Sequence, residues 1–155
     1  MTNDPGDRRV DSLDRQLCFA VYSAAHAFNR AYKPYLAALG LTYPQYLAML
    51  VLWEEDGCPV KALSERLLLD SGTLTPLLKR LEAAGLVTRR RGREDERQVF
   101  IDLTDAGRAL HDKAAQLPNP VPCAVEESGL PAARLLADIR HLRGALLSRA
   151  AADEG

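Results

Sequence analysis

Three thiols are the first groups in this sequence that could do chemistry. Cys18, Cys58 and Cys123 are an odd number of cysteines in a chain of 155 residues whose first residues hold no apolar, export-type segment. We therefore expect a cytoplasmic protein without structural disulfides, in which any disulfide acts as a redox switch. A cysteine thiolate attacks a peroxide oxygen to give a sulfenic acid, which a second thiol condenses to a disulfide.

The basic side chains gather in one segment. Between Lys79 and Arg97 there are seven basic and four acidic residues, a net charge of +3, whereas the whole chain carries −1. The densest point is the sequence RRRGR at 89–93. A nearly neutral chain with one basic stripe is typical of a protein that places a single face against a polyanion such as DNA.

Other kinds of chemistry find little support in the residues. The longest apolar run, Tyr46–Trp53, is too short to span a membrane, so we expect no membrane partner. The histidines at 26, 111 and 141 lie far apart and no CxxC or HxxxH pair occurs, so we expect no metal site. The chain also lacks a glycine-rich phosphate loop, and we expect no cofactor.

The elements that would position these groups are mostly helical. An apolar stripe begins near Ser12 and meets Pro34, which ends or kinks the helix, and Thr42 with Gln45 forms a capping-box pattern for a second, all-round apolar helix. The segment 117–123 holds three prolines and is expected to be extended. Further helices are expected over 59–67, 71–84, 105–116 and from 131 to about 148.

Two strands, at 87–91 and 98–103, are predicted on either side of a charged turn. A short helix, a brief turn, a longer helix and a basic hairpin together describe a winged helix-turn-helix. Pro76 leaves open whether the longer helix starts after Ser71 or is kinked. We expect a single domain over 1–155, mostly α with a small β-hairpin, in which 42–103 is the winged helix-turn-helix and 12–40 and 104–150 are dimerisation helices.

The predicted recognition helix at 71–84 starts with small polar residues and carries cations in its far half. Its first two turns contain no Arg, Asn or Gln. Recognition of the base sequence must therefore depend more on hydroxyl hydrogen bonds, methyl contacts and DNA shape. Arginines of the hairpin would lie beside it and contact phosphates or the minor groove. The candidate residues of the DNA-binding surface are Asp70, Ser71, Gly72, Thr73, Thr75, Pro76, Lys79, Arg80, Arg89, Arg91, Asp95 and Arg97.

The segment LLDSGTLTPLLKRLEAAGLVTRRRGREDERQVFIDLTDAG resembles the MarR family of winged-helix transcriptional regulators. The triplet Asp95-Glu96-Arg97 matches the wing motif of that family, in which the arginine enters the minor groove and the aspartate holds it by a salt bridge. The resemblance implies these roles for Arg97 and Asp95. It also implies a homodimer whose partner is operator double-stranded DNA.

Around Cys18, the sequences LDRQLCFAVYS, AYKP and LTYPQYLAML resemble the organic hydroperoxide resistance regulator (OhrR) branch of the family. This resemblance implies that Cys18 senses an organic hydroperoxide, that Tyr32 and Tyr43 hydrogen-bond it, and that Cys123 is the resolving thiol of a two-cysteine subgroup whose disulfide joins subunits. Tyr32 lies fourteen residues after Cys18, about 21 Å along one helix, so contact requires a second, antiparallel copy. Cys58 is expected to be a spectator.

These observations favour a repressor that binds its operator when reduced and releases it on oxidation of Cys18. Three alternatives stay open. The chain could instead be a MarR regulator of a small aromatic ligand or another oxidant such as hypochlorite, a thiol peroxidase, or a winged-helix protein-interaction module. The absence of a Lys or His near Cys18 in sequence disfavours the enzyme.

Overall fold

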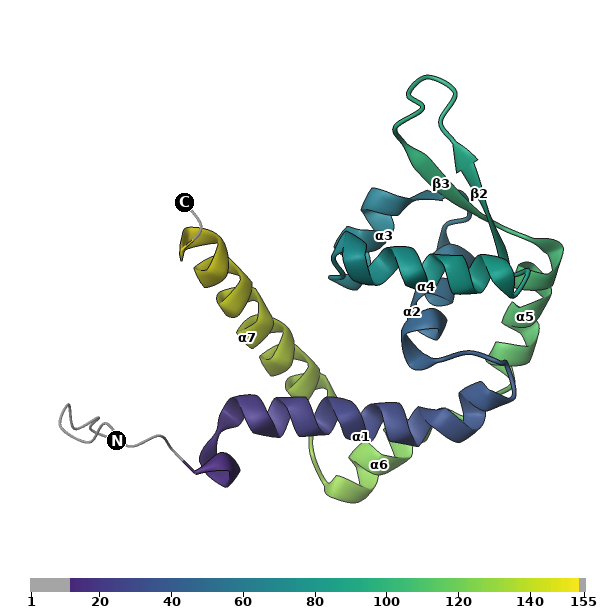
Figure 1. Cartoon of the computed structure of the whole chain (residues 1–155). Coiled ribbons are helices and arrows are strands. Elements are labelled where there is room, and N and C mark those ends of the chain that lie inside the picture. The colour runs from purple at the N-terminus through teal and green to yellow at the C-terminus, as the bar shows by residue number, and fades with distance from the viewer. Residues whose placement is uncertain (1–11, 154–155) are drawn as a thin grey trace. The chain divides into compact units, whose positions relative to one another are not determined.

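A computed structural model describes residues 12–153, and the chain separates into two compact units, Met1–Pro118 and Asn119–Gly155 (Figure 1). The first unit contains a 3-10 helix (Leu13–Arg15), helices α1 (Leu17–Ala37), α2 (Tyr43–Glu54), α3 (Val60–Leu67), α4 (Ser71–Ala83) and α5 (Asp105–Ala115), and strands β1 (Cys58–Pro59), β2 (Val87–Arg91) and β3 (Val99–Leu103). The second contains α6 (Pro120–Ser128) and α7 (Ala132–Asp153). The single domain expected over 1–155 stays a prediction.

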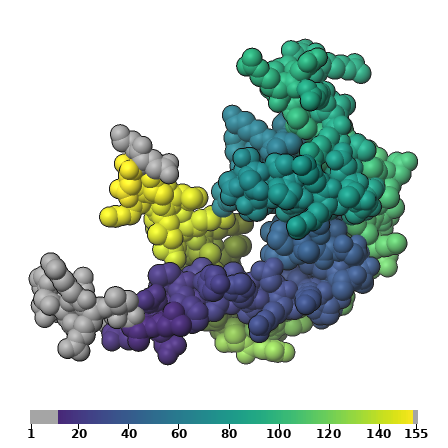
Figure 2. All heavy atoms as spheres, in the orientation of Figure 1, coloured from purple at the N-terminus to yellow at the C-terminus, as the bar shows by residue number. Residues whose placement is uncertain are grey.

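The predicted winged helix-turn-helix is confirmed. Helices α3 and α4 form the helix-turn-helix, and the hairpin β2–β3 is the wing that projects beyond the helices of this unit (Figure 2). The three strands are antiparallel in the order β1-β3-β2. Both predicted strands are found to within one residue of their predicted bounds.

The short strand β1 was missed by the sequence reasoning. Cys58 pairs with Ile101 and Pro59 with Phe100, so β1 covers one edge of β3. Pro59 has φ −61° and ψ 141° and serves as the N-cap of α3 rather than its first residue. A strand of two residues shows no alternation of polar and apolar side chains, and a proline there is equally compatible with a helix start.

Helix α2 lies at the centre of the core, as its uniformly apolar sequence predicts. Ala48, Met49 and Leu52 of this helix are fully buried. The leucine stripe of α4 packs against it and is buried at all four predicted positions, Leu74, Leu77, Leu78 and Leu81. Burial of these side chains is the main favourable contribution to folding of this unit.

The predicted cap signals are also confirmed. The Thr42 N–H donates to Gln45 Oε1 at 2.8 Å at the start of α2, and Thr104 Oγ1 accepts from the Gly107 N–H at 3.0 Å at the start of α5. Gly85, with φ +72°, follows α4 in the left-handed conformation that a glycine adopts at least cost. These contacts satisfy backbone groups that the helices themselves leave without partners.

Prolines lie inside two of the helices. Helix α4 begins at Ser71 and continues through Pro76, so a later start is wrong. Helix α1 continues past Pro34 to Ala37. Each proline removes one N–H donor from its helix, and neighbouring turns and tertiary packing keep the helix continuous.

The expectation of an extended segment at 117–123 is wrong, because α6 begins within it. Asn119 Oδ1 accepts from the Val121 N–H at 3.0 Å and caps the helix. Pro120 and Pro122 occupy the first and third positions, where a backbone N–H has no acceptor within the helix. The prolines therefore start this helix, and Cys123 lies on its first turn.

Asp56 connects three elements of the first unit. Its Oδ1 accepts from the Leu103 N–H at 2.7 Å and from the Gly57 N–H at 2.8 Å. Its Oδ2 pairs with Arg108 Nη2 at 2.7 Å. One carboxylate after the end of α2 thus holds the last residue of β3 and the first turns of α5.

Gly107 allows a second close contact between α5 and the rest of this unit. Trp53 Nε1 donates to the Gly107 carbonyl at 2.9 Å, and a Cβ at Gly107 would lie 2.1 Å from the Leu86 carbonyl oxygen. No side chain fits at that distance. Helix α5 therefore lies directly against the backbone that joins α4 to β2.

Replacing Asp56 should reveal its electrostatic role. Partial burial raises the pKa of this carboxyl, but the N–H of Leu103 and the guanidinium of Arg108 outweigh it and hold the pKa below its ordinary value. Its contribution to stability is therefore present above the unfolded-state pKa, near pH 4, and is lost as the pH falls through the lower folded-state value. Asp56→Asn should lower the free energy of unfolding at neutral pH by about 1–3 kcal/mol.

Urea unfolding followed between neutral pH and about pH 3 tests this expectation. Asp56→Asn should lose less further stability on acidification than the wild type does. Asp112→Asn, which changes an exposed carboxylate on α5, is the matched control and should leave both stability and its pH dependence almost unchanged. Equal behaviour of the two variants would contradict the role assigned to Asp56.

Candidate functional site

The turn between α3 and α4 sets the start of the recognition helix. Leu68 ends α3 in the left-handed conformation with φ +54°, which is uncommon for a side chain of this size. Asp70 then caps α4: its Oδ1 accepts from the Thr73 N–H at 2.9 Å and its Oδ2 from Thr73 Oγ1 at 3.1 Å. These hydrogen bonds lower the pKa of Asp70. The carboxylate of Asp70 therefore stabilises the start of α4. From the sequence, Asp70 was predicted only as a DNA contact and not as a helix cap.

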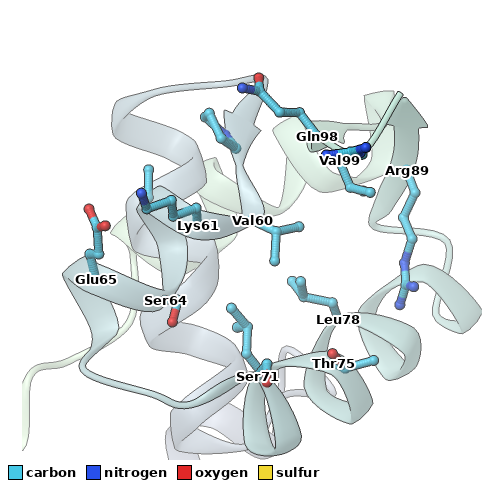
Figure 3. Close-up of a pocket in the computed structure, with 14 residues that line it drawn as sticks. Val60, Lys61, Ser64, Glu65, Ser71, Thr75, Leu78, Arg89, Gln98 and Val99 are labelled. Carbon is cyan, nitrogen blue, oxygen red and sulfur yellow. The ribbon is translucent and has the colours of Figure 1, made fainter. Parts of the chain in front are cut away.

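A groove of about 930 Å³ lies between α3, the first half of α4 and the base of the wing (Figure 3). Val60, Leu78 and Val99 give it an apolar floor, while Ser71 and Thr75 present hydroxyls along α4. Lys61 and Glu65 of α3 and Arg89, Arg97 and Gln98 of the wing complete its polar rim. Four of the predicted DNA-contacting residues, from three elements, thus surround one groove: Ser71, Thr75, Arg89 and Arg97.

The remaining candidates on α4 and β2 are solvent-exposed. On the helix they form an accessible row of small and cationic side chains: Gly72, Thr73, Pro76, Lys79 and Arg80. Arg91 is exposed at the end of β2. All of these residues are therefore accessible to a polyanion in the isolated chain.

Arg89 is more enclosed than the other wing arginines. Its side chain is 29% exposed, and Nε lies 3.4 Å from Glu82 Oε2 of α4. Its Nε and Nη2 are shielded from solvent and make no hydrogen bond within the described part of the chain. A second acceptor is needed to satisfy these donors, and an anion in the groove would supply it.

The wing turn differs in one detail from what the resemblance implies. Asp95 Oδ1 accepts from the backbone N–H of Arg97 at 2.9 Å, and no ion pair joins these two side chains within residues 12–153. The Gly92 N–H donates to the Gln98 carbonyl at 2.8 Å and closes the turn. Asp95 thus shapes the loop, and the guanidinium of Arg97 stays exposed.

Tyr32 and Tyr43, predicted as thiol partners, lie together between the end of α1 and the start of α2. Their ring centroids are 5.0 Å apart, and Tyr46 joins them at 6.2 Å from Tyr32. Burial raises the pKa of the Tyr43 phenol, and the nearby Tyr46 raises it further. The phenol of Tyr43 therefore stays protonated at neutral pH and can donate a hydrogen bond to an anion. Tyr46 was not among the candidates, although its three-residue spacing from Tyr43 places both on one helix face.

Cys18 lies near the other end of α1 and is exposed. It shares one continuous helix with Tyr32, as predicted, so the two cannot meet within a chain. Tyr22 and His26 follow it at four-residue intervals, with their rings 4.4 Å apart in an edge-to-face arrangement. Aromatic side chains therefore line the same helix face as the thiol.

The other two thiols differ sharply in exposure. Cys58 is fully buried in β1, and burial raises the pKa of its thiol. This environment supports its prediction as a spectator, because the reactive form is the thiolate. Cys123 is exposed on α6.

Between residues 12 and 153 no group of three or more His, Cys, Asp or Glu could hold a metal ion, and no helix is long and apolar enough to cross a membrane.

An exposed recognition helix beside a basic wing defines a winged-helix module of the regulator type. Residues 30–114 match the family described as transcriptional regulator SarA/Rot. The chain is 46% identical, over 86% of both lengths, to the organic hydroperoxide resistance transcriptional regulator of Bacillus subtilis (strain 168). It therefore belongs to the MarR-type family of winged-helix transcriptional regulators, which confirms the family and the prediction of a regulator rather than an enzyme.

Two further similarities have different coverage. The chain is 67% identical over 110 residues to the HTH-type transcriptional regulator TtmR of Methylorubrum extorquens (strain PA1), a match that spans 71% of this chain but only 56% of the relative. The solved structure of reduced AbfR bound to DNA is 38% identical, with a TM-score of 0.64 over 84% of this chain and 94% of that one. A disulfide-formed structure of AbfR is also similar, with a TM-score of 0.58 over 84% and 91%.

Thiol labelling should distinguish the three cysteines. A Cys18→Ser/Cys123→Ser variant keeps only the buried Cys58, so it should react with Ellman's reagent slowly in buffer and fully in denaturant. Cys58→Ala is the control and should keep the fast-reacting thiols of the native protein. Rapid labelling of the double variant in buffer would show that Cys58 is accessible and would reopen its assignment as a spectator.

Proposed function

We propose that this protein is a homodimeric repressor that binds operator DNA when Cys18 is reduced and releases it when an organic hydroperoxide oxidises that thiol. The observation that carries this proposal is the separation of Cys18, near the start of α1, from Tyr32, near the end of the same helix, where the ring of Tyr43 from α2 lies against it. Only a second copy of α1 can bring the phenols of one chain to the thiol of another. The sensor would then be complete only in the dimer.

The apolar surface of the single chain supports a dimer. Leu17, Val21 and Phe28 of α1 are 63%, 47% and 40% exposed. Helix α7 also leaves large apolar side chains uncovered, among them Leu136, Ile139 and Leu146. Several exposed large apolar side chains on one helix mark an interaction surface, and both helices belong to the segments predicted to dimerise.

The DNA-facing surface supports the operator as the partner. The hydroxyls and cations of α4 are accessible, and the wing adds the exposed guanidiniums of Arg91 and Arg97. In a dimer each α4 would enter one major groove, with half-sites about one helical turn apart. The similar AbfR, whose reduced form has been solved on DNA, supports this reading.

The proposed chemistry requires only this chain and the peroxide. The Cys18 thiolate attacks the terminal peroxide oxygen, an S–O bond forms as the O–O bond breaks, and the alkoxide leaves and is protonated to an alcohol. The Cys123 thiol then attacks the sulfenic sulfur, a disulfide forms and water leaves. No Lys or His lies close to Cys18 in sequence, so the phenols of Tyr32 and Tyr43 would stabilise the thiolate.

Cys18→Ser should bind the operator as the wild type does and should not be released by cumene hydroperoxide. A mobility-shift assay with a duplex selected by the reduced wild-type protein measures both properties. Reduced and peroxide-treated wild type are the controls. Release of the Cys18→Ser variant by the peroxide would contradict the mechanism, and its release by an aromatic ligand alone would favour a ligand-responsive regulator.

Cys123→Ser should bind the operator but should form no dithiol-reversible disulfide. Because its sulfenic acid cannot be resolved by a second thiol, excess peroxide should drive Cys18 to sulfinic acid, which dithiothreitol does not reverse. Non-reducing electrophoresis and the recovery of DNA binding after dithiothreitol measure this. Recovery equal to that of the wild type would show that Cys123 is not the resolving thiol.

A further inference from the structure

One wing arginine is held quite differently from its neighbours. Arg90 Nε lies 2.9 Å from Asp102 Oδ2 and its Nη2 lies 3.2 Å from Asp102 Oδ1, so two parallel hydrogen bonds join β2 to β3. The guanidinium also lies 5.0 Å from the centroid of the Phe100 ring. Phe100 is the partner of Arg90 in the strand register. A bidentate ion pair and a cation–π contact thus fix one side chain across the hairpin.

The position of Arg90 on the strand separates it from the groove. Side chains alternate along β2, so Arg90 faces the opposite side of the hairpin from Arg89, which lines the groove. Asp102, its partner, faces the turn before β1, where its Oδ1 would lie 3.1 Å from a Cβ at Gly57. The ion pair therefore lies at the base of the wing, on the face away from the groove.

Among the described residues, the other exposed cations of the wing have no carboxylate partner. Within residues 12–153, Arg91, Arg93 and Arg97 form no ion pair, whereas the charge of Arg90 is offset by a carboxylate that engages two of its nitrogens. A guanidinium committed in this way adds little to the attraction for phosphates. The wing extends beyond the helices (Figure 1), so its direction depends on contacts at its base.

We propose that Arg90, with Asp102 and Phe100, is a positioning residue that sets the direction and rigidity of the wing and does not itself contact DNA. The inference rests on the proposed function, because its consequence is operator affinity. A wing held in one direction presents Arg97 and Arg91 to the groove of the duplex without first losing conformational freedom. Loosening the base would lower affinity without removing a phosphate contact.

The salt dependence of binding separates positioning from contact. Each phosphate contact that a variant loses reduces the slope of log K against log salt by about 0.9. We expect Arg90→Ala to lower affinity by about tenfold, comparable to the loss of one base-contacting side chain, with the slope unchanged. Arg97→Ala, the matched control on the same hairpin, should lower both affinity and slope. A reduced slope for Arg90→Ala would overturn the proposal.

For Asp102→Asn, a contact role and a positioning role of Arg90 predict changes in DNA affinity of opposite sign. If Arg90 contacted DNA, removing the carboxylate would free a cation and raise affinity. The positioning role instead requires that Asp102→Asn lower affinity about as much as Arg90→Ala, and that the double variant lose little more. Fluorescence anisotropy with the selected duplex measures all three. Higher affinity of Asp102→Asn would overturn the proposal.

Hydrogen exchange tests the wing without DNA. Arg90→Ala and Asp102→Asn should speed exchange of the Gly92 amide, which closes the wing turn, and leave amides of the buried helix α2 unchanged. Unchanged exchange at Gly92 would overturn the proposal whatever the DNA result. If the variants loosen the wing but the wild type selects no duplex, the proposed function fails while the structural role of Arg90 stands.

Discussion

The carboxylate of Asp56 is the contact on which the arrangement of the winged-helix unit depends. It lies just after the central helix α2, and it holds the end of β3 through the Leu103 N–H and α5 through Arg108. The wing thus leaves the core at a point fixed by a charged hydrogen bond rather than by apolar packing alone. Apolar contacts can slide at small cost, whereas a carboxylate that accepts from a defined N–H sets both distance and direction.

The groove is lined by α3, α4 and the wing, and the wing includes the strand β3 that Asp56 holds. Its floor comes from leucines and valines of α3, α4 and β3, and its polar rim comes from side chains of α3, α4, β2 and the wing turn. Because α4 is fixed by the buried leucine stripe and capped by Asp70, its hydroxyls have defined positions. The wing is buried only on the inner face of its base, at Val87, Ile101 and Leu103, and its outer face depends on the cross-strand contacts of Arg90. The two parts of the surface are therefore stabilised by different physical means.

Local signals predicted much of this architecture from the sequence. The caps at Thr42 and Thr104, the leucine stripe of α4 and the alternation in β3 each depend on residues a few positions apart, and all were confirmed. What the sequence could not show depends on distant partners. In the sequence, Asp56 indicates only a turn. Its structural role depends on Leu103, which lies 47 positions away and donates a hydrogen bond to it. Strand β1 likewise exists only because β3 lies next to it.

The same limit applies to the thiol site. Cys18 is exposed and Tyr32 lies against Tyr43, while the roles assigned to these residues stay predictions. Tyr46 was missed because its aromatic ring fits equally well in the apolar core. The three prolines led to the wrong prediction of an extended segment at 117–123. Proline breaks a helix in its interior but is favourable in the first turn of a helix. Whether a proline breaks or starts a helix therefore depends more on its position relative to the N-cap than on its residue type.

The absence of a side chain at Gly107 has a consequence for how such a regulator can diverge. With the Leu86 carbonyl only 2.1 Å from where a Cβ would lie, every mutation at this codon meets backbone rather than a side chain that could move aside. Side chains at the tip of the wing and on the exposed face of α4 meet solvent instead, so substitutions there can alter the outer surface without disturbing the contact at Gly107. The geometry of the fold is thus least tolerant of substitution at Gly107 and most tolerant at its surface.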